Sequence, residues 1–313
     1  MKYLLLTVAI CMFSTVFGQR YKSSFSGRNN WTANSKEFNI KVGATQFLGD
    51  LGGRDQIGRQ RSMADLNWAA TRMGIGAGYR LRFAPILSTS TNLYFGLVSG
   101  DDAHTNEIIR NSRNLHFRAQ IVEFSQRFEI IVLANEMAGS RSGLSRSASR
   151  AKADQLYLFT GIGGLFFNPQ AQIQGRWQNL QPLNTEGQGL PGGADPYSRF
   201  TATVPFGIGF KLGIDKDWRI GLELSYHMTF TDYIDDVSTN YYDPAVLASS
   251  VGPESAYASN PAKANHNWFV PGQQRGNPDD NDAFFLANIV LTRNLSSPRG
   301  RSRGPRYAGR AKF

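Results

Sequence analysis

The densest group of residues that could do chemistry is acidic and lies in one short segment, which holds Asp232, Asp235 and Asp236. Carboxylate oxygens are the hard ligands that Ca²⁺ prefers, although the spacing here is not that of an EF-hand. Carboxylates in a loop also accept hydrogen bonds from backbone or arginine donors and then serve only structure. The sequence favours the structural loop and leaves a calcium site open.

A second candidate for chemistry is His104, which lies near Asp101 and Asp102. Some enzymes at the membrane edge combine a histidine with a carboxylate and a serine, but the chain has no H-E-x-x-H pair and no G-x-S-x-G elbow. The glycine-rich segment 161–164 does not open a helix, as a phosphate loop would. We therefore predict a protein that is not an enzyme and carries no catalytic residue, cofactor or metal.

The N-terminus predicts export. Lys2 precedes an apolar run over 3–17, and Gly18 ends a segment that resembles a signal-peptide cleavage site. Cys11 is the single cysteine, and the bulky Ile10 before it disfavours lipidation. We expect residues 1–18 to be a signal peptide, so that the mature chain has no disulfide and no thiolate metal site.

Beyond residue 36, apolar and polar residues alternate, and this period of two is typical of β-strands. In the segment 72–83, for example, Met73, Ile75 and Ala77 alternate with glycine and arginine. An even number of antiparallel strands can close without edges, as lipid requires. The sequence predicts an all-β, transmembrane, antiparallel up-and-down barrel of about eight strands, OmpA/OmpW-like, over 37–295. The candidate strands are 38–44, 72–83, 87–97, 115–132, 155–166, 200–214, 218–230 and 283–295.

Details of these strands make further predictions. Gly74, Gly76 and Gly78 are expected on the inner face, where a narrow lumen leaves little space. A change of phase before Phe128 predicts a bulge or a strand that extends beyond the membrane. Aromatic residues near strand ends are expected to form interfacial girdles. These residues are Phe83, Tyr94, Trp218, Phe230 and Tyr233.

The connections alternate in length. Those at 84–86 and 215–217 are very short, and those at 49–65, 99–113, 167–198 and 231–282 are long. Outer-membrane barrels have short periplasmic turns and long outer loops, so both chain termini are expected in the periplasm, with 19–36 as an N-terminal periplasmic segment. The connection 135–154 breaks the alternation, being long and periplasmic. Its basic residues, Arg141, Arg146, Arg150 and Lys152, make it a candidate docking segment.

The formal net charge is +10, and much of the excess lies in the C-terminal tail 296–313. Such a composition builds no core and is expected to be disordered until bound. An exported protein meets no nucleic acid, so the tail is either merely solvated or docks to an acidic protein or to anionic head groups. The basic residues considered for docking are Arg299, Arg301, Arg303 and Arg306.

Five separated segments share a pattern with one known family. They are Ser99-Gly100-Asp101-Asp102, the run Arg113–Arg118, Phe166-Phe167-Asn168-Pro169-Gln170-Ala171, the run Leu180–Gly189 and the run Thr229–Thr239. Together, over about 37–295, they resemble the PorG family of outer-membrane barrels in the type IX secretion system of Bacteroidetes.

The resemblance implies a structural role. PorG-like barrels attach the periplasmic ring of PorK lipoprotein and PorN to the outer membrane, in machinery that exports proteins and supports gliding in some bacteria. The partners implied are this ring and outer-membrane lipids. No catalytic residue is implied, and the motif residues look like rim and loop architecture. These residues are Gly100, Asp101, Asp102, Asn114, Pro169, Pro182, Glu186, Gly187, Asp232, Tyr233, Asp235, Asp236 and Ser238.

Two other functions remain open from the sequence. A passive OmpA- or OmpW-like barrel would act as a small pore or as a carrier of small apolar solutes, although a plugged eight-stranded lumen argues against a wide pore. A barrel enzyme acting on lipids would depend on His104 and Asp102.

Overall fold

The structure, a computed structural model, describes residues 31–51, 68–105, 107–136, 153–215, 217–263 and 267–296. The predicted signal peptide, the basic residues of the 135–154 connection and those of the C-terminal tail lie outside these described residues.

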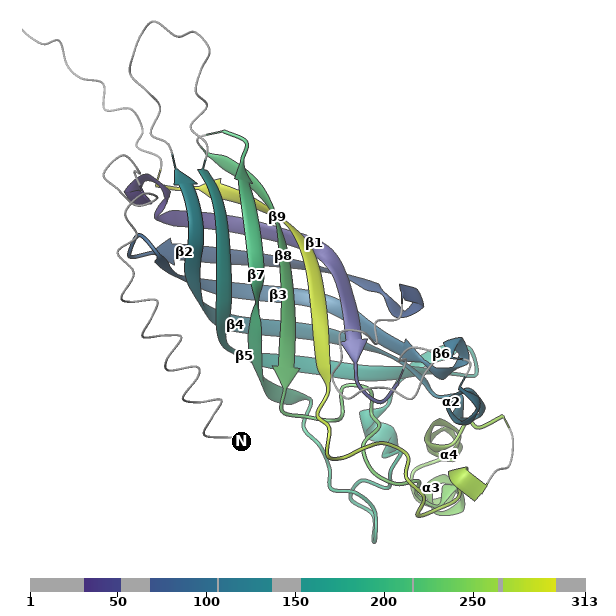
Figure 1. Cartoon of the computed structure of the whole chain (residues 1–313). Coiled ribbons are helices and arrows are strands. Elements are labelled where there is room, and N and C mark those ends of the chain that lie inside the picture. Colours follow the sequence, from purple (N-terminus) through teal and green to yellow (C-terminus); the bar gives the residue numbers. More distant parts are fainter. Residues whose placement is uncertain are drawn as a thin grey trace, which may run out of the picture.

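Eight strands pair with their neighbours in antiparallel order, and the last strand also pairs with the first. The sheet is therefore closed, as Figure 1 shows. The barrel strands are β1 Lys36–Leu48, β2 Arg72–Arg82, β3 Leu87–Asp101, β4 His116–Glu136, β5 Ala153–Ile173, β7 Phe200–Gly213, β8 Trp218–Thr229 and β9 Ala283–Asn294. The predicted eight-stranded up-and-down barrel is confirmed.

One further strand, β6 (Arg176–Asn179), was not predicted. It folds back on the end of β5 through Gln174 and Gly175, whose φ angles of 50° and 80° suit a two-residue hairpin turn. The connections also hold short helices. They are η1 Trp31–Asn34, η3 Trp68–Ala70, η4 Asp102–His104, α2 Ile108–Arg113, η5 Gln181–Leu183, α3 Pro244–Ser250, α4 Pro253–Ser259 and η6 Asn267–Phe269.

Among the described residues, none of the helices has the length and apolar character needed to cross a membrane.

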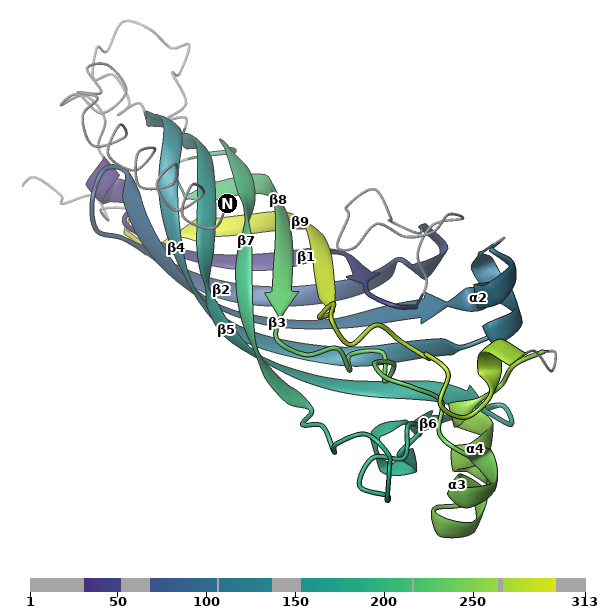
Figure 2. The same ribbon diagram turned by 60° about the horizontal axis from the view of Figure 1, so that its bottom comes forward.

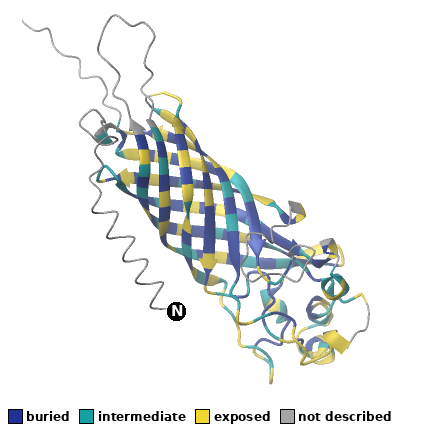
Figure 3. Cartoon of the chain, in the orientation of Figure 1, coloured by how far each residue is buried: buried dark blue, intermediate teal, exposed yellow. Residues whose placement is uncertain are grey.

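The barrel wall has the polarity of a protein surrounded by lipid. On β8 the outward side chains Ile220 and Leu224 are 44% and 46% exposed, whereas the inward Arg219 and Glu223 are 2% and 3% exposed. The same alternation of buried and exposed positions runs along the other strands in Figure 3. A soluble barrel would reverse this pattern, because water would face the polar side chains.

Of the residues predicted to form aromatic girdles, Phe83, Trp218 and Phe230 are exposed on the outer wall. The prediction is wrong for Tyr94, which is buried inside the barrel and donates a hydrogen bond to Asn288 at 3.2 Å. The inward glycines make room for it: a Cβ added at Gly76 would lie 2.7 Å from the Tyr94 ring.

Three strands, β3, β4 and β5, continue past the rest of the barrel toward α2 (Figure 2). Along β4, Phe117 and Ile121 are buried on the inner side, and further along the same side the buried residues become Glu123 and Arg127. The backbone phase is unchanged between them, and the apolar side switches because β4 begins beyond the membrane and then enters it. The predicted extension is therefore confirmed, and a register shift occurs later, at 131–133.

The long connections β1–β2, β3–β4, β5–β7 and β8–β9 share one end of the barrel, which we call the loop end. The short turns β2–β3 and β7–β8 share the other, the turn end, together with the start of β1 and the end of β9. This is the predicted alternation.

A charge on the outer wall should destabilise the barrel. Leu224 lies midway between Trp218 and Phe230 on the outward row of β8. We expect Leu224→Arg to lower the free energy of unfolding in lipid vesicles by about 2–4 kcal/mol, the cost of arginine near a bilayer midplane. Ile109→Arg, on the exposed face of α2 at the loop end, is the control and should change it little. Equal effects of both substitutions in denaturant titrations would contradict the membrane placement.

Candidate functional site

The lumen holds a network of buried charges, in which Glu223 is one centre. Its carboxylate accepts hydrogen bonds from Lys41 Nζ at 2.6 Å, from Arg127 Nη1 at 2.8 Å and from the Tyr157 hydroxyl at 3.0 Å. These donors come from β1, β4 and β5, so one carboxylate on β8 links strands across the lumen.

Glu37 is a second centre, nearer the turn end. It accepts hydrogen bonds from Arg219 Nη1 at 2.6 Å and from Lys211 Nζ at 3.0 Å, and it lies 3.3 Å from Arg80 Nη1. The Arg80 side chain also forms an ion pair with Glu129 through Nε. The cations thus bridge acids on separate strands.

Glu123 and His227 form a third group toward the loop end. Glu123 Oε2 lies 2.6 Å from His227 Nδ1 and accepts a hydrogen bond from Thr203 Oγ1 at 3.3 Å. The His227 ring stacks on Phe284, with ring centroids 4.6 Å apart. Phe284 belongs to the apolar core at the mouth of the barrel, so this pair joins the lumen to that core.

The largest fully buried side chains of the described chain include Arg80, Arg82 and Arg219, all of which point into the lumen. An eight-stranded barrel has an interior just wide enough for side chains to fill. The inward side chains of the described strands therefore form ion pairs that link strands across a narrow lumen.

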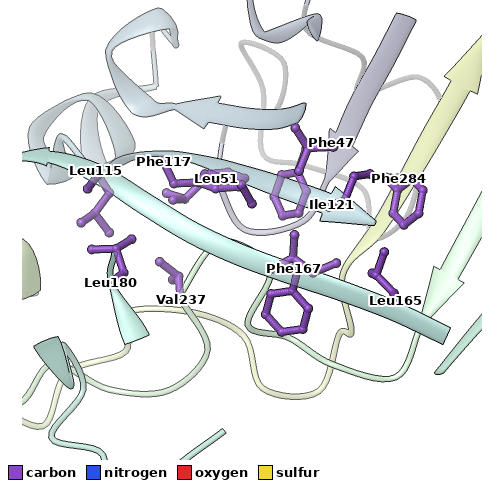
Figure 4. Packing of buried hydrophobic residues seen from close by; sticks show 14 of the residues in the cluster. Phe47, Leu51, Leu115, Phe117, Ile121, Leu165, Phe167, Leu180, Val237 and Phe284 are labelled. Atoms are coloured by element: carbon purple, nitrogen blue, oxygen red, sulfur yellow. The ribbon is translucent and has the colours of Figure 1, made fainter. Parts of the chain in front are cut away.

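At the loop end, apolar side chains form a core that lies over the barrel mouth (Figure 4). Figure 4 shows Phe117 and Phe167 from the extended strands close to Leu51, Leu180 and Val237 from the loops. We call these loops and this core the cap. The apolar core lets the long connections pack on one another rather than extend freely.

Polar contacts in the cap centre on Glu186 and Arg275. Arg275 Nη1 donates to Glu186 Oε1 at 2.9 Å and to the Asp236 carbonyl at 2.5 Å. Glu186 also accepts from the backbone N–H groups of Ser238 at 2.9 Å and Thr239 at 3.0 Å. Three segments from two connections, one from 174–199 and two from 230–282, are fastened at this point.

A second ion pair fastens the connection between β3 and β4. Arg113 donates to the two oxygens of Asp102, through Nε at 2.7 Å and Nη2 at 3.0 Å. The same guanidinium donates to the carbonyls of Asp50 at 3.0 Å and Arg275 at 2.9 Å. Asp102 is thus held by an arginine that also binds two other segments of the cap.

The acidic segment of the sequence is split between two environments. Asp236, at φ 66°, accepts hydrogen bonds from Thr185 Oγ1 at 2.5 Å and from the Tyr197 hydroxyl at 2.6 Å. Asp235 accepts from the backbone N–H groups of Leu51 at 3.2 Å and Val237 at 3.0 Å. Within the described ranges, no group of three or more His, Cys, Asp or Glu side chains is arranged to hold a metal ion. These contacts match the structural-loop interpretation.

Four carboxylates in the cap, outside the membrane-spanning strands, lie close enough to repel one another. Burial raises the pKa of Asp232 to about 9, and the charges of Asp235 and Asp50 add to the shift. Burial and the neighbouring acids also hold the pKa values of Asp235 and Asp282 well above their usual range. Protonation of some of these carboxyl groups removes negative charge and so reduces the repulsion among them.

The other motif residues serve the backbone of the cap. Asn114 ends α2 in the left-handed region at φ 59° and donates to the Pro261 carbonyl at 3.1 Å. Gly187 has φ 71°, and a Cβ at Gly100 would lie 2.7 Å from the Leu51 carbonyl oxygen. The remaining placements are Asp101 as the N-cap of η4, Pro169 in β5, Pro182 in η5 and Tyr233 stacked on Tyr197 at 4.4 Å.

Sequence reasoning missed Arg275, Asp282 and Asp50 as members of the cap. Asp282 Oδ2 accepts from the Ile234 N–H at 2.8 Å, and Asp50 Oδ2 accepts from the Asn277 N–H at 2.6 Å. Each is a single residue in an irregular connection, and no periodicity or motif singles it out. The Tyr233 ring belongs to the cap and not to the predicted girdle.

The described strands close without an edge, their outer side is apolar and their inner side is charged. In lipid, only helices and closed barrels provide hydrogen-bond partners for all backbone N–H and C=O groups. An apolar outer side with a polar interior is the arrangement found in bacterial outer-membrane barrels. The fold is that of an outer-membrane β-barrel.

No family model and no curated protein matches the sequence. Among solved structures, the chain is similar to Ail, the attachment invasion locus protein of Yersinia pestis, in a crystal structure with the heparin analogue sucrose octasulfate. The two sequences are 8% identical, the match covers 83% of this chain and 98% of Ail, and the TM-score is 0.32. It is also similar to the outer membrane protein OprG from Pseudomonas aeruginosa, at 8% identity, 83% and 94% coverage and a TM-score of 0.32.

Removing the Glu223 carboxylate should destabilise the barrel. Glu223→Leu leaves Lys41 and Arg127 buried without this partner, and we expect a loss of about 3–5 kcal/mol in the free energy of unfolding. Glu254→Leu, at an exposed position of α4, is the control and should cost little. Denaturant titration in vesicles measures both, and an unchanged midpoint for Glu223→Leu would contradict the structural role of the network.

The cap should loosen as pH rises. An acid whose pKa is raised on folding stabilises the fold fully below its unfolded pKa, about 4, and that stability is lost as pH rises through the folded pKa. For Asp232 the loss therefore extends to about pH 9. We expect faster proteolysis of the cap at pH 9 than at pH 6, relative to an unfolded substrate. Asp232→Asn should reduce the difference, whereas the exposed Asp279→Asn should not; equal rates at both pH values would contradict the shift.

Proposed function

We propose that this chain is a non-catalytic outer-membrane component of a type IX secretion system, which anchors a PorK/PorN-type periplasmic ring to the outer membrane. The observation that carries the proposal is the filled lumen, in which Glu223 and Glu37 each hold two or more cations. A barrel whose interior is occupied by ion pairs is suited to be a scaffold rather than a pore. This role agrees with the resemblance to PorG-like barrels.

The cap also supports a scaffold. Most residues that carry the family resemblance, including Asp102, Glu186 and Asp236, are buried in the cap and bind its own backbone or side chains. Side chains whose polar atoms are engaged in hydrogen bonds within the cap keep the loops in one arrangement and are not available as a catalytic site. We therefore propose that partners contact the opposite end.

The turn end gathers the segments that are candidates for docking. The C-terminal segment leaves the barrel beside the start of β1, where the Lys36 N–H donates to Ser296 Oγ at 2.7 Å. The 135–154 connection joins β4 to β5 at the same end. Both segments are basic in sequence, and in the proposed orientation both face the periplasm. An acidic surface on the ring would attract them, with a strength that falls as salt screens the charges.

In-cell cross-linking and pull-down from washed outer membranes test the proposal. We expect the barrel to recover the periplasmic ring proteins, and recovery to fall when Arg141, Arg146, Arg150 and Lys152 are all replaced by Gln or when 297–313 is deleted. Replacing the loop-end residues Arg176 and Lys263 by Gln removes charge at the opposite end and should leave recovery intact.

Recovery of the barrel alone, with secretion intact in a deletion strain, would contradict the proposal and favour a passive barrel. Ring recovery that is insensitive to salt and to both basic segments would retain the anchor but overturn charge-driven docking.

A further inference from the structure

The outer wall changes from apolar to polar at one level near the loop end. On β3 the outward row reads Phe95, then Leu97, then Ser99. In the paired register, Leu97 lies opposite Gln120 and Ser99 opposite Arg118 on β4. Below this level Phe95 is exposed to the surroundings of the barrel. The change of polarity marks where hydrocarbon ends and the head-group region begins.

A cleft of about 200 Å³ lies at this level on the outer wall. The ends of β3 and β4 form its floor, and the segment around η3 and the hairpin strand β6 form its sides. Its lining includes Arg72, Arg118, His116 and Trp177, and Leu97 lies on its apolar side. The cleft is thus continuous with the apolar wall that lipid tails contact.

Arg118 is held in place within this cleft. Its Nε donates to Gln170 Oε1 at 3.0 Å, and its guanidinium lies 3.9 Å from the centre of the Trp177 ring. Within the described ranges, its terminal Nη nitrogens have no protein acceptor. A stacked guanidinium with unused donors is pre-organised for a planar or tetrahedral anion.

The other charges of the cleft leave it positive. Arg72 is exposed and donates through Nη1 to the carbonyls of Ala69 at 3.2 Å and Thr71 at 2.9 Å. Among the described residues that line the cleft, Asp101 is the one acid, and its Oδ1 accepts from the Ala103 N–H at 2.8 Å. Two arginines therefore face one carboxylate that is already engaged in a helix cap.

We propose that this cleft binds the phosphate head group of a membrane lipid in the leaflet nearer the loops, with the acyl chains along the outward row at Phe95. Arginine recognises phosphate through paired N–H donors, and tryptophan favours the membrane–water interface. The inference depends on the membrane barrel alone and is independent of ring attachment.

Native mass spectrometry of the full chain in mild detergent tests the site. The probes are phosphatidic acid and phosphatidylcholine with the same acyl chains. We expect selective retention of phosphatidic acid, reduced about tenfold in Arg72→Gln/Arg118→Gln because charge-assisted hydrogen bonds are lost. Arg293→Gln is the matched control, since Arg293 also lies over a tryptophan, Trp218, but at the turn end; it should retain the lipid as the unchanged protein does.

Equal retention of the two lipids, or equal retention by the double variant and the unchanged protein, would overturn the site. If inorganic phosphate displaces the lipid as effectively as added phosphatidic acid does, the cleft recognises a free anion and the lipid assignment is wrong. Heat-dependent mobility on gels reports whether the double variant is folded. If the double variant does not fold, the single substitution Arg72→Gln, at an exposed side chain, is compared with the unchanged protein in the same lipid-retention measurement.

Discussion

The pairing of every backbone N–H and C=O group within the wall is the constraint on which the rest of this structure depends. Lipid offers no hydrogen bonds, so the strands must close, and β9 pairs with β1 along its whole length. Closure by eight strands leaves a narrow interior. The inward side chains are then buried whatever their chemistry, and the charged ones are stable only when they are paired with one another.

That pairing unites the two ends of the molecule. Glu223 and Glu37 draw cations from several strands into the lumen, and His227 continues the network to Phe284 at the barrel mouth. Beyond the mouth the chain is no longer in lipid, so β3, β4 and β5 bury apolar side chains on their inner side and the loops pack on them. Arg275 and Arg113 then hold the loops to one another at the end opposite the short turns.

The wall could be predicted from the sequence because lipid imposes one rule on every second residue, as in Ile220, Leu222 and Leu224 of β8. Tyr94 was misplaced because its aromatic type was given more weight than its phase: it alternates with the outward Leu93 and Phe95, and its ring lies inside the barrel against Gly74 and Gly76. The cap was not predictable beyond its motifs. Arg275, Glu186 and Asp236 meet from distant loops, and such contacts leave no periodic signal; β6 is four residues long and was missed for the same reason.

The central claim is that the lumen is filled by paired charges, and the conductance of the purified barrel in a planar lipid bilayer tests it most directly. A filled lumen predicts no steady conductance above that of the bare membrane at any salt concentration. Stable, ohmic steps that scale with the salt concentration would show a continuous water path and would contradict the account.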